Sequence, residues 1–309
     1  MTQLIKKLHV AAVAVTYNPE IQELERLLAQ LIGQVNEVIV VDNASANAAL
    51  LPDTQIATAK ALHWIFLPEN CGIAAAHNAG IAEARRLGAT HIALFDQDSE
   101  PADDMVPCLL AALERLEAMG HSVACVGPRY VDERQDNPPP FIRVEGLHLR
   151  RCVCTQADDI VAVDYLISSG SLIPMSALDT AGGMRSDLFI DYVDIEWGMR
   201  AQHKGLLSYG VCAAGMRHSL GNRPLEFLGR KIPLHSPLRH YYHFRNAVLL
   251  YKEPWVRWNW KLVDGWRLCL KYVFYSLFAR PRMAHWGMMT LGVWHGLRGK
   301  TGKFDGSTS

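Results

Sequence analysis

Two aspartates separated by one residue, Asp96 and Asp98, directly follow the apolar segment 91–95. An apolar strand has no packing reason to end in acids, whereas paired carboxylates are suitable oxygen ligands for a divalent cation. Such a cation could in turn hold a diphosphate. A simple turn is the alternative, because aspartate also hydrogen-bonds its own backbone at strand ends. These residues alone leave both interpretations open.

Two earlier apolar runs also end in polar clusters. Residues 10–15 lead into Thr16-Tyr17-Asn18, and residues 37–41 lead into Asp42-Asn43. Adjacent parallel strands place their carboxyl ends at one edge of a sheet, so we expect the three clusters to converge on one nucleotide-binding crevice. No GxGxxG or GxxxxGK[ST] pattern follows the first strand, which argues against a dinucleotide dehydrogenase or a P-loop enzyme.

A second acidic group contains Asp191, Asp194 and Glu196. A carboxylate on the face of a sugar opposite the leaving group can accept the proton of an attacking hydroxyl. A helix from about Val193 would place Asp194 near its start and Glu196 one turn before Arg200. The alternative is a charged helix start, which the helix dipole favours.

His218 and its neighbour Arg217 are further candidates for a site that binds a metal and phosphate. Imidazole is acceptable to manganese, and guanidinium groups bind phosphate oxygens. Taken singly, a structural histidine and a solvated arginine are the plainer interpretations.

Hydrophobic periodicity predicts strands at 10–15, 37–41, 62–67, 90–95 and 122–126, with helices at 21–32, 72–87 and 105–119. This alternation is typical of an α/β protein with a parallel, doubly wound sheet. Residues 130–160 are predicted to be irregular, with a breaker at 137–140. We also expect a strand with a polar centre at 164–173 and a short strand at 206–211.

The chain has 309 residues, of which half are hydrophobic and 20% are charged, as in an ordinary globular protein. That length suits one large domain with a smaller appendage. The seven cysteines form no pair of CxxC motifs, so we expect reduced thiols in a cytoplasmic protein and no zinc site. The N-terminus lacks a signal-peptide pattern, and no apolar run reaches the roughly 20 residues of a spanning helix.

The C-terminal segment is basic and rich in tryptophan. Residues 252–309 contain ten Lys/Arg and three Asp/Glu, a net charge of +7, and six of the eight tryptophans lie within 253–299. Tryptophan beside basic residues is typical of a membrane interface. A helical cap packed on the main domain is the alternative, and nucleic-acid binding is a poorer third because no known motif accompanies the charge.

These motifs occur together in an order that resembles the family 2 glycosyltransferases of the GT-A fold, most closely their rhamnosyltransferase branch. The resemblance covers about residues 10–250. It is carried by VTYNP at 15–19, VDNAS at 41–45, ENCGIAAAHNAG at 69–80, FDQDS at 95–99, LISSG at 166–170, FIDYVDIEWGMRA at 189–201 and SPLRHYYHFRN at 236–246.

The resemblance implies a fold and a set of donor-binding residues. The fold would be a Rossmann-like, mostly parallel sheet with helices on both faces, a GT-A domain at 1–250 and a basic, Trp-rich helical extension at 251–309. The residues implied for the nucleotide sugar are Thr16, Tyr17 and Asp42 at the nucleoside, Asn70, Gly72 and Asn78 in the nucleotide pocket, Asp96 near the ribose or sugar, and Arg217 and Arg245.

The resemblance also implies a metal site and a base. Asp98 and His218, with Asp96, would bind Mg²⁺ or Mn²⁺ on the diphosphate. Asp194 occupies the position of the catalytic base, supported by Glu196. The acid that usually precedes this aspartate is Val193 here, which keeps Asp191 as an alternative base.

The implied reaction is the inverting, metal-dependent transfer of L-rhamnose from dTDP-L-rhamnose to a hydroxyl of a glycolipid or lipid-linked saccharide. Such a reaction serves the synthesis of cell-surface polysaccharide, lipopolysaccharide or rhamnolipid, at the inner face of the plasma membrane. No nucleic-acid partner is expected. The alternatives are the same fold with a UDP- or GDP-sugar donor, and a non-catalytic, membrane-associated adaptor.

Overall fold

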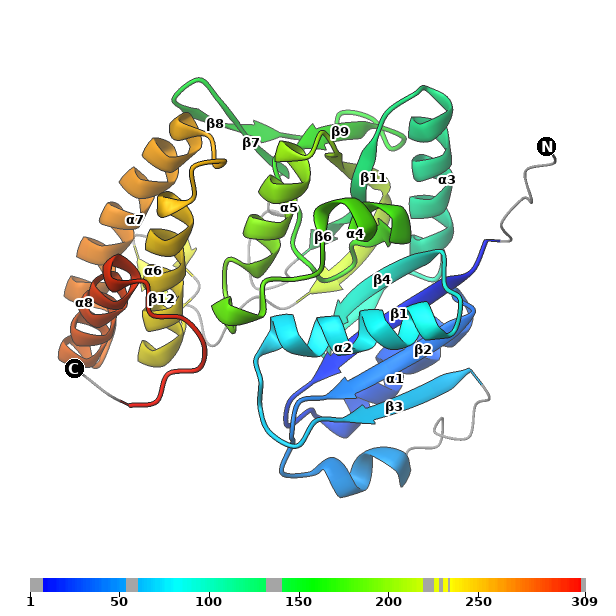
Figure 1. Ribbon diagram of the computed structural model, residues 1–309, viewed down its shortest axis with the longest axis horizontal. Helices are drawn as coiled ribbons and strands as arrows, with labels where there is room; N and C mark the ends of the chain where they lie inside the picture. The colour runs from blue at the N-terminus through cyan, green and yellow to red at the C-terminus, as the bar shows by residue number, and fades with distance from the viewer. Residues whose placement is uncertain are drawn as a thin grey trace.

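The computed structural model describes residues 8–53, 61–131, 141–218, 225–227, 230–232 and 234–306. Within these ranges a nine-stranded sheet runs in the order β3-β2-β1-β4-β10-β6-β11-β5, with β9 paired to β11 (Figure 1). The strands are β1 (Val10–Thr16), β2 (Glu37–Asp42), β3 (Leu62–Phe66), β4 (His91–Asp96), β5 (Ser99–Pro101), β6 (Val123–Val131), β9 (Ile160–Val163), β10 (Leu172–Pro174) and β11 (Leu207–His218).

Helices cover both faces of this sheet. The helices of the main body are α1 (Ile21–Ile32), α2 (Ile73–Arg86), α3 (Met105–Ala118), α4 (Met175–Ala181) and α5 (Val193–His203), with short 3₁₀ helices η1 (Ala48–Asp53) and η2 (Ser186–Leu188). One buried cluster joins α1 and α3 to one face, and another joins α2, α4 and α5 to the opposite face. Along β1, Val10, Ala12 and Ala14 enter the first cluster while the residues between them enter the second. Burial on both faces explains why this strand is apolar throughout.

The sheet is parallel in its first half and mixed in its second. Strands β1 to β4 pair in parallel, as do β6 and β11, whereas β10, β5 and β9 run antiparallel to their partners. The predicted mostly parallel α/β sheet is therefore confirmed. The antiparallel strands lie in the part of the chain where the sequence pattern was least regular.

Two local predictions are wrong. The region expected to be irregular contains a hairpin of β7 (Phe141–Glu145) and β8 (His148–Cys152), while the breaker at 137–140 lies outside the described residues. The strand expected at 164–173 exists only from Leu172, because the backbone turns at Gly170 with a φ of +81°. That conformation strongly favours glycine and ends any extended run.

The expectation of reduced cysteines is also wrong in one place. Cys154 and Cys212 form a disulfide across 58 residues of sequence. They meet because β9 pairs with β11, and the Cys212 amide donates to the Asp159 carbonyl at 3.0 Å. Sequence spacing carries no sign of this contact. Five other cysteines are free.

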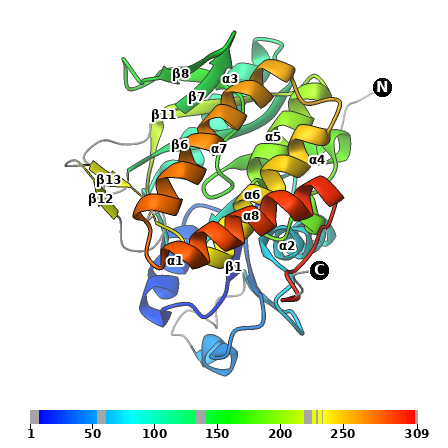
Figure 2. The same ribbon diagram turned by 90° about the vertical axis from the view of Figure 1, so that its left-hand side faces the viewer.

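Three helices form a bundle on one side of the molecule (Figures 1 and 2). They are α6 (Pro237–Lys252), α7 (Trp258–Phe278) and α8 (Arg282–Arg298), which follow the short strands β12 (Leu225–Phe227) and β13 (Arg230–Ile232). The predicted helical extension is thus confirmed, and α6 shares a buried cluster with it. The division at 250/251 into two domains stays a prediction. None of the helices in the described ranges combines the length and hydropathy needed to cross a membrane.

Candidate active site

The polar ends of three parallel strands meet at one sheet edge, as the sequence predicts. In the strand register Thr16 lies opposite Asp42, and Asp96 lies opposite Val15. The Tyr17 amide donates to the Gln97 side chain at 2.7 Å, which joins the loops that follow β1 and β4. The three clusters therefore form one site.

Asp42 is a buried acceptor within this edge, with 1% of its surface exposed. Its carboxylate accepts from the Thr16 hydroxyl at 3.0 Å and the Ser45 amide at 2.9 Å, and also from the Ser45 hydroxyl. Thr16 is fully buried, whereas 49% of Tyr17 is exposed. The pair Thr16–Asp42 thus shapes the loop, and Tyr17 is the residue of this set that a ligand can reach directly.

Asn70 and Gly72 connect the edge to the segment that carries the acids. The Asn70 side-chain oxygen accepts from the Gly72 amide at 3.0 Å and from the Asn43 amide group at 3.2 Å. Gly72 has a φ of +86°, and a Cβ there would lie 2.4 Å from the Phe189 carbonyl oxygen. Any side chain would push this segment away, so Gly72 sets the distance between the two halves of the site.

Asn78 has a structural role in the described residues. Its side-chain amide donates to the Met184 carbonyl at 2.8 Å and accepts from the Met184 amide at 2.8 Å. It also donates to Ser186 at 3.0 Å. This pairing holds the segment between α4 and η2 against α2. A direct contact with the nucleotide stays a prediction.

The turn before α5 has an unusual backbone. Phe189, Asp191 and Tyr192 all have positive φ values, of 68°, 64° and 64°. Such conformations cost free energy in non-glycine residues and persist only where surrounding contacts hold them. The side-chain amide nitrogen of Asn246 lies 2.8–2.9 Å from the carbonyl oxygens of Leu188, Ile190 and Asp191.

Arg245, next to Asn246, holds the same turn. Only 1% of it is exposed, and its guanidinium donates to the Leu188 carbonyl at 2.9 Å and the Gly302 carbonyl at 2.6 Å. It also lies over the Tyr242 ring. The guanidinium donors are used inside the protein, and a nucleotide contact of Arg245 stays a prediction.

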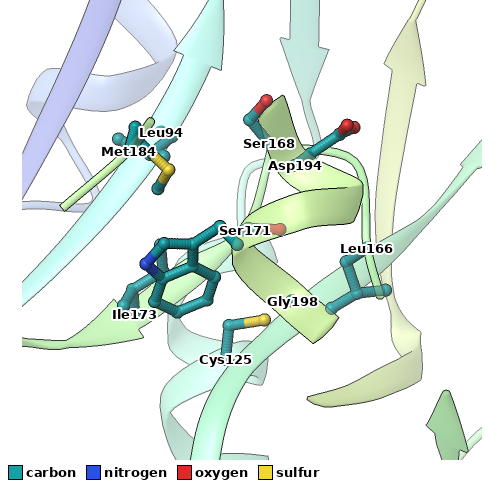
Figure 3. Close-up of a pocket in the computed structure, with 10 residues that line it drawn as sticks. Leu94, Cys125, Leu166, Ser168, Ser171, Ile173, Met184, Asp194 and Gly198 are labelled. Atoms are coloured by element: carbon teal, nitrogen blue, oxygen red, sulfur yellow. The ribbon is translucent and has the colours of Figure 1, made fainter. Parts of the chain in front are cut away.

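Asp194 lies in the first turn of α5, where the held turn directs it toward the end of β4. Its carboxylate accepts from the Ile195 amide at 2.8 Å. Burial raises the pKa of Asp194 to about 6, and the charges of Asp191 and Asp96 act in the same direction. Asp194 and Ser168 lie at the same edge of a small pocket (Figure 3). A carboxyl with such a pKa is suited to accept a proton near neutrality.

One arginine balances this group of acids. Arg239 of α6 contacts both carboxylate oxygens of Asp191 at 3.3 Å. The Asp191 charge, with smaller effects from Asp96 and Asp194, raises the pKa of Arg239. Asp191 is therefore held in an ion pair, and both of its carboxylate oxygens are in contact with Arg239. The sequence contained Arg239 within the 236–246 motif, but its spacing gave no sign of this partner.

Glu196 lies away from the acids, as part of the support of α5. It is 1% exposed and pairs with Arg200 at 2.8 Å, the i,i+4 contact that the sequence predicts. Arg200 also donates to the Gly183 carbonyl at 2.8 Å and to the Ala181 carbonyl. This network joins α5 to the end of α4, so Glu196 positions the helix that carries Asp194.

The backbone brings the predicted metal ligands together. Strand β5 pairs with the end of β11 so that Ser99 lies opposite His218, and Asp98 directly precedes Ser99. Arg217, which is exposed, lies opposite Glu100. The His218 side chain lies outside the described residues, and the described side chains contain no group of three His, Cys, Asp or Glu that could hold a metal. Two carboxylates and an imidazole fit a divalent cation by their chemistry.

Ser169 is a residue of the site that sequence reasoning gave no role. Its hydroxyl accepts from the Asp96 amide at 3.3 Å and hydrogen-bonds the Ser99 hydroxyl. Ser169 therefore ties the Asp96–Asp98 turn to the segment that precedes β10. The sequence shows the Ser168-Ser169-Gly170 pattern, but only the fold shows that Ser169 hydrogen-bonds Asp96 at the end of β4 and Ser99 beyond it.

A mostly parallel α/β sheet with acids and hydroxyls gathered at one edge is the architecture of a GT-A nucleotide-sugar transferase. The family model described as glycosyl transferase family 2 matches residues 12–166. A dTDP-rhamnosyl transferase, RfbF of Shigella flexneri, is 34% identical over 246 residues, which cover 79% of this chain and 80% of the relative. The chain belongs to glycosyltransferase family 2, and it is a glycosyltransferase. The predicted resemblance to the rhamnosyltransferase branch is confirmed.

More distant relatives agree on the fold. A galactofuranosyltransferase, GlfT1 of Mycolicibacterium smegmatis, is 26% identical over 62% of this chain and 68% of its own length. The structure of GalNAc-T7 with UDP, GalNAc and Mn²⁺ matches with a TM-score of 0.59 and 12% identity, covering 93% of this chain and 56% of that one. Residues 1–349 of S. aureus TarS match at 0.52 and 13% identity, over 94% and 92% of the two chains.

Proposed function

We propose that this protein transfers L-rhamnose from dTDP-L-rhamnose, with inversion, to a hydroxyl group of a glycolipid or lipid-linked saccharide. The observation that carries the proposal is Asp194, whose pKa is raised to about 6 beside the end of β4. The donor is inferred from the rhamnosyl transferase relative, which is similar over 79% of the chain.

Asp194 acts as the general base in this proposal. It accepts the proton of the acceptor hydroxyl as that oxygen attacks the anomeric carbon from the face opposite the diphosphate. Arg239 keeps Asp191 in an ion pair, whereas Asp194 forms no ion pair with any other residue of the described ranges. Attack from the opposite face inverts the anomeric configuration.

Donor binding is assigned to the sheet edge and to a divalent cation. Tyr17 and the loop shaped by Asp42 would contact the nucleoside, while Asn70 and Gly72 would form the pocket wall and Asp96 would face the ribose or sugar. Asp98 and His218 would hold Mg²⁺ or Mn²⁺, with Arg217 near the phosphates. When bound, the cation offsets the charge that develops on the leaving diphosphate.

The exposed face of α7 supports a peripheral membrane location at the inner leaflet, near a lipid-bearing acceptor. Its apolar side chains recur every three or four residues, and each is at least half exposed: Trp258, Leu262, Trp266, Leu270, Val273 and Leu277. A helix with such a stripe, in a segment of net charge +7, suits an anionic membrane surface. It lies along the outer side of the bundle (Figure 2).

The direct experiment combines nucleotide binding with transfer. Wild-type protein should be stabilised more by dTDP than by UDP or GDP, and should transfer rhamnose from dTDP-rhamnose to at least one member of a glycolipid panel, detected by mass. Asp194→Asn should keep the affinity for dTDP, and its rate of rhamnose transfer should fall by at least about 10³-fold. The amide cannot accept the proton of the acceptor hydroxyl. A chelator or Asp98→Ala should also abolish transfer.

Asp179→Asn provides the matched control, because Asp179 is an exposed partner of Arg85 far along α4. Normal turnover by Asp194→Asn would contradict the base assignment. Stronger stabilisation by UDP or GDP would point to another donor sugar, and full activity with chelator would exclude the metal role. A protein that binds dTDP and transfers nothing to any acceptor would fit a non-catalytic adaptor.

A further inference from the structure

A cavity of about 240 Å³ lies beside the catalytic helix, between β6, the β7–β8 hairpin and α7. Its walls are mainly aromatic and aliphatic, and two arginines from different elements line it. The lining side chains include Phe141, Arg151, Tyr165, Leu166 and Arg267. Apolar walls with a few convergent polar groups are typical of small-molecule sites. Nothing in the donor site described above accounts for this cavity.

The cavity adjoins Asp194 through shared walls. Leu166 and Ser171 line both the cavity and the small pocket that contains Asp194 (Figure 3). Tyr165 packs on α5 at Gly198, where a Cβ would lie 2.8 Å from the Tyr165 Cβ. Gly198 is one turn after Asp194, so both positions lie on the same face of α5.

Charged groups of both signs lie near Tyr165. Burial raises the pKa of Tyr165, and the charges of Asp264 and then Asp194 act in the same direction, whereas the Arg267 guanidinium opposes them. Tyr165 therefore contacts the helix that carries Asp194 and shares the cavity wall with Arg267. An acceptor that placed its hydroxyl at Asp194 and a sugar ring against Tyr165 would extend toward Arg267.

The two arginines are available to an anion. Arg151 and Arg267 are exposed at the cavity rim, and neither forms an ion pair with another described residue. By contrast Arg150, the neighbour of Arg151 on β8, pairs with Glu145 at 3.0 Å. Guanidinium groups bind phosphate in a bidentate manner.

Arg267 also borders the apolar stripe of α7. Its neighbour Trp266 is 66% exposed, and Leu270 is 51% exposed. The hairpin reaches the same helix, since the Asn259 side chain donates to the Gly146 carbonyl at 3.0 Å. The hairpin and α7 thus lie side by side (Figure 2). The exposed Trp266 and Leu270 flank Arg267 on this helix.

We infer that this cavity is the acceptor subsite, and that Arg151 and Arg267 bind the phosphate that joins the acceptor saccharide to its lipid. The saccharide lies against Tyr165 and Phe141, and the lipid leaves along the stripe of α7. This inference rests on the proposed function, which it deepens by assigning the acceptor to phosphate-linked glycolipids and not to neutral ones.

The test uses farnesyl diphosphate as a soluble probe, with the full chain saturated by dTDP and Mg²⁺ so that the donor site is filled. Calorimetric titration should show binding to the wild type, with affinity at least tenfold lower in Arg151→Ala/Arg267→Ala. Arg150→Ala, the matched control on the same strand, should bind like the wild type. Farnesol and inorganic pyrophosphate should each bind more weakly than farnesyl diphosphate.

Equal binding by the double variant, or equal binding of farnesol, would overturn the phosphate assignment. Equal binding of inorganic pyrophosphate would overturn the lipid part, because the rim would then be a site for free phosphate. The dTDP titration that precedes the probe tests the proposed donor separately. Both arginines are exposed, so their replacement leaves the fold intact, which thermal unfolding verifies.

Discussion

Asp194 is the residue whose environment most clearly departs from that of an ordinary aspartate. Burial, with the charges of Asp191 and Asp96, raises its pKa to about 6. A base acts only when deprotonated, so kcat/KM should fall as pH drops below about 6. A bound cation would move this limb to lower pH, because positive charge favours the carboxylate. A pH profile without an acid limb between pH 4 and 7 would contradict the assignment.

The same raised pKa makes a prediction about folding. Between the unfolded pKa of 3.8 and the folded value of about 6, the folded protein binds the Asp194 proton more tightly. This contribution to stability is complete below pH 3.8 and is lost as pH rises through 6. The full shift corresponds to roughly 3 kcal/mol, and the solvent-accessible part of the Asp194 side chain reduces it to about 1–2 kcal/mol. Urea unfolding without metal should therefore show Asp194→Asn more stable than wild type at pH 7, with no difference at pH 3.5.

At the residue scale, the sequence predicted which residues belong to the site better than it predicted which side chains they contact. The placement of Asp194 in the first turn of a helix and the Glu196–Arg200 pair were read from spacing of three and four residues, which a helix fixes locally. The Asp191–Arg239 pair spans 48 residues. Contacts at that separation depend on how whole helices pack, which periodicity does not contain.

At the scale of elements, two glycines determine how closely α8 approaches α6. A Cβ at Gly292 would lie 2.4 Å from the Tyr241 carbonyl oxygen, and one at Gly296 would lie 2.7 Å from the Arg245 carbonyl oxygen. These contacts involve backbone atoms, which cannot move aside cheaply. Because Arg245 and Asn246 hold the turn before α5, separation of α6 from α8 would also disturb the position of Asp194.

Gly292→Ala should therefore destabilise the protein by about 1–3 kcal/mol through overpacking. Gly287 supplies a matched control in the same helix, because a Cβ there meets nothing within 4 Å. Gly287→Ala should stabilise by about 0.5–1 kcal/mol, as alanine has the higher helix propensity. Chemical denaturation of both variants measures the difference. Equal effects of the two substitutions would show that α8 does not pack closely on α6.

The stripe on α7 makes a separate prediction about membranes. Trp258 and Trp266 are 69% and 66% exposed, so their replacement costs little folding energy. Trp258→Ser/Trp266→Ser should reduce binding to vesicles that contain 30% anionic phospholipid by at least about tenfold, since each ring contributes roughly 1.5–3 kcal/mol of apolar burial. Met119→Ser, at an exposed site (65%) outside the tail, is the control. Unchanged sedimentation of the double variant would mean that this face does not meet the membrane.

Elements were predictable where a single periodicity dominated. Strands β1, β2 and β4 are buried on both faces and so read as continuous apolar runs, whereas β7 and β8 alternate irregularly and were missed. Short β10 was obscured because its neighbours turn at Gly170. The disulfide was missed because Cys154 and Cys212 lie on segments that only the sheet pairing brings together.

At the scale of the whole molecule, several histidines are buried in neutral form. Burial lowers the pKa of His77 to about 4, that of His235 to about 4 and that of His240 to about 3. The charge of His285 also lowers the pKa of His240, and the charge of Arg239 also lowers the pKa of His235. The nearby Asp191 opposes this effect at His235. His77 is fully buried in α2, and His240 lies within the bundle.

These groups make the fold sensitive to acid. Unfolded histidine binds a proton near pH 6.5, whereas the folded protein resists that proton down to about pH 4. Stability is therefore lost as pH falls below 6.5, which is opposite in sign to the contribution of Asp194. Three histidines outweigh one aspartate, so the protein should unfold more easily at pH 5 than at pH 7.

His77→Leu isolates one of these contributions, because leucine does not titrate and needs no polar partner. From pH 7 to pH 5 this variant should lose about 2 kcal/mol less stability than the wild type, as expected for a pKa moved from 6.5 to about 4. His148→Leu, at an exposed position of β8, should follow the wild-type curve. Urea midpoints at the two pH values measure the effect. Parallel losses in both variants would show that His77 accepts its proton in the folded protein, and the acid sensitivity would then have to arise in the helical bundle.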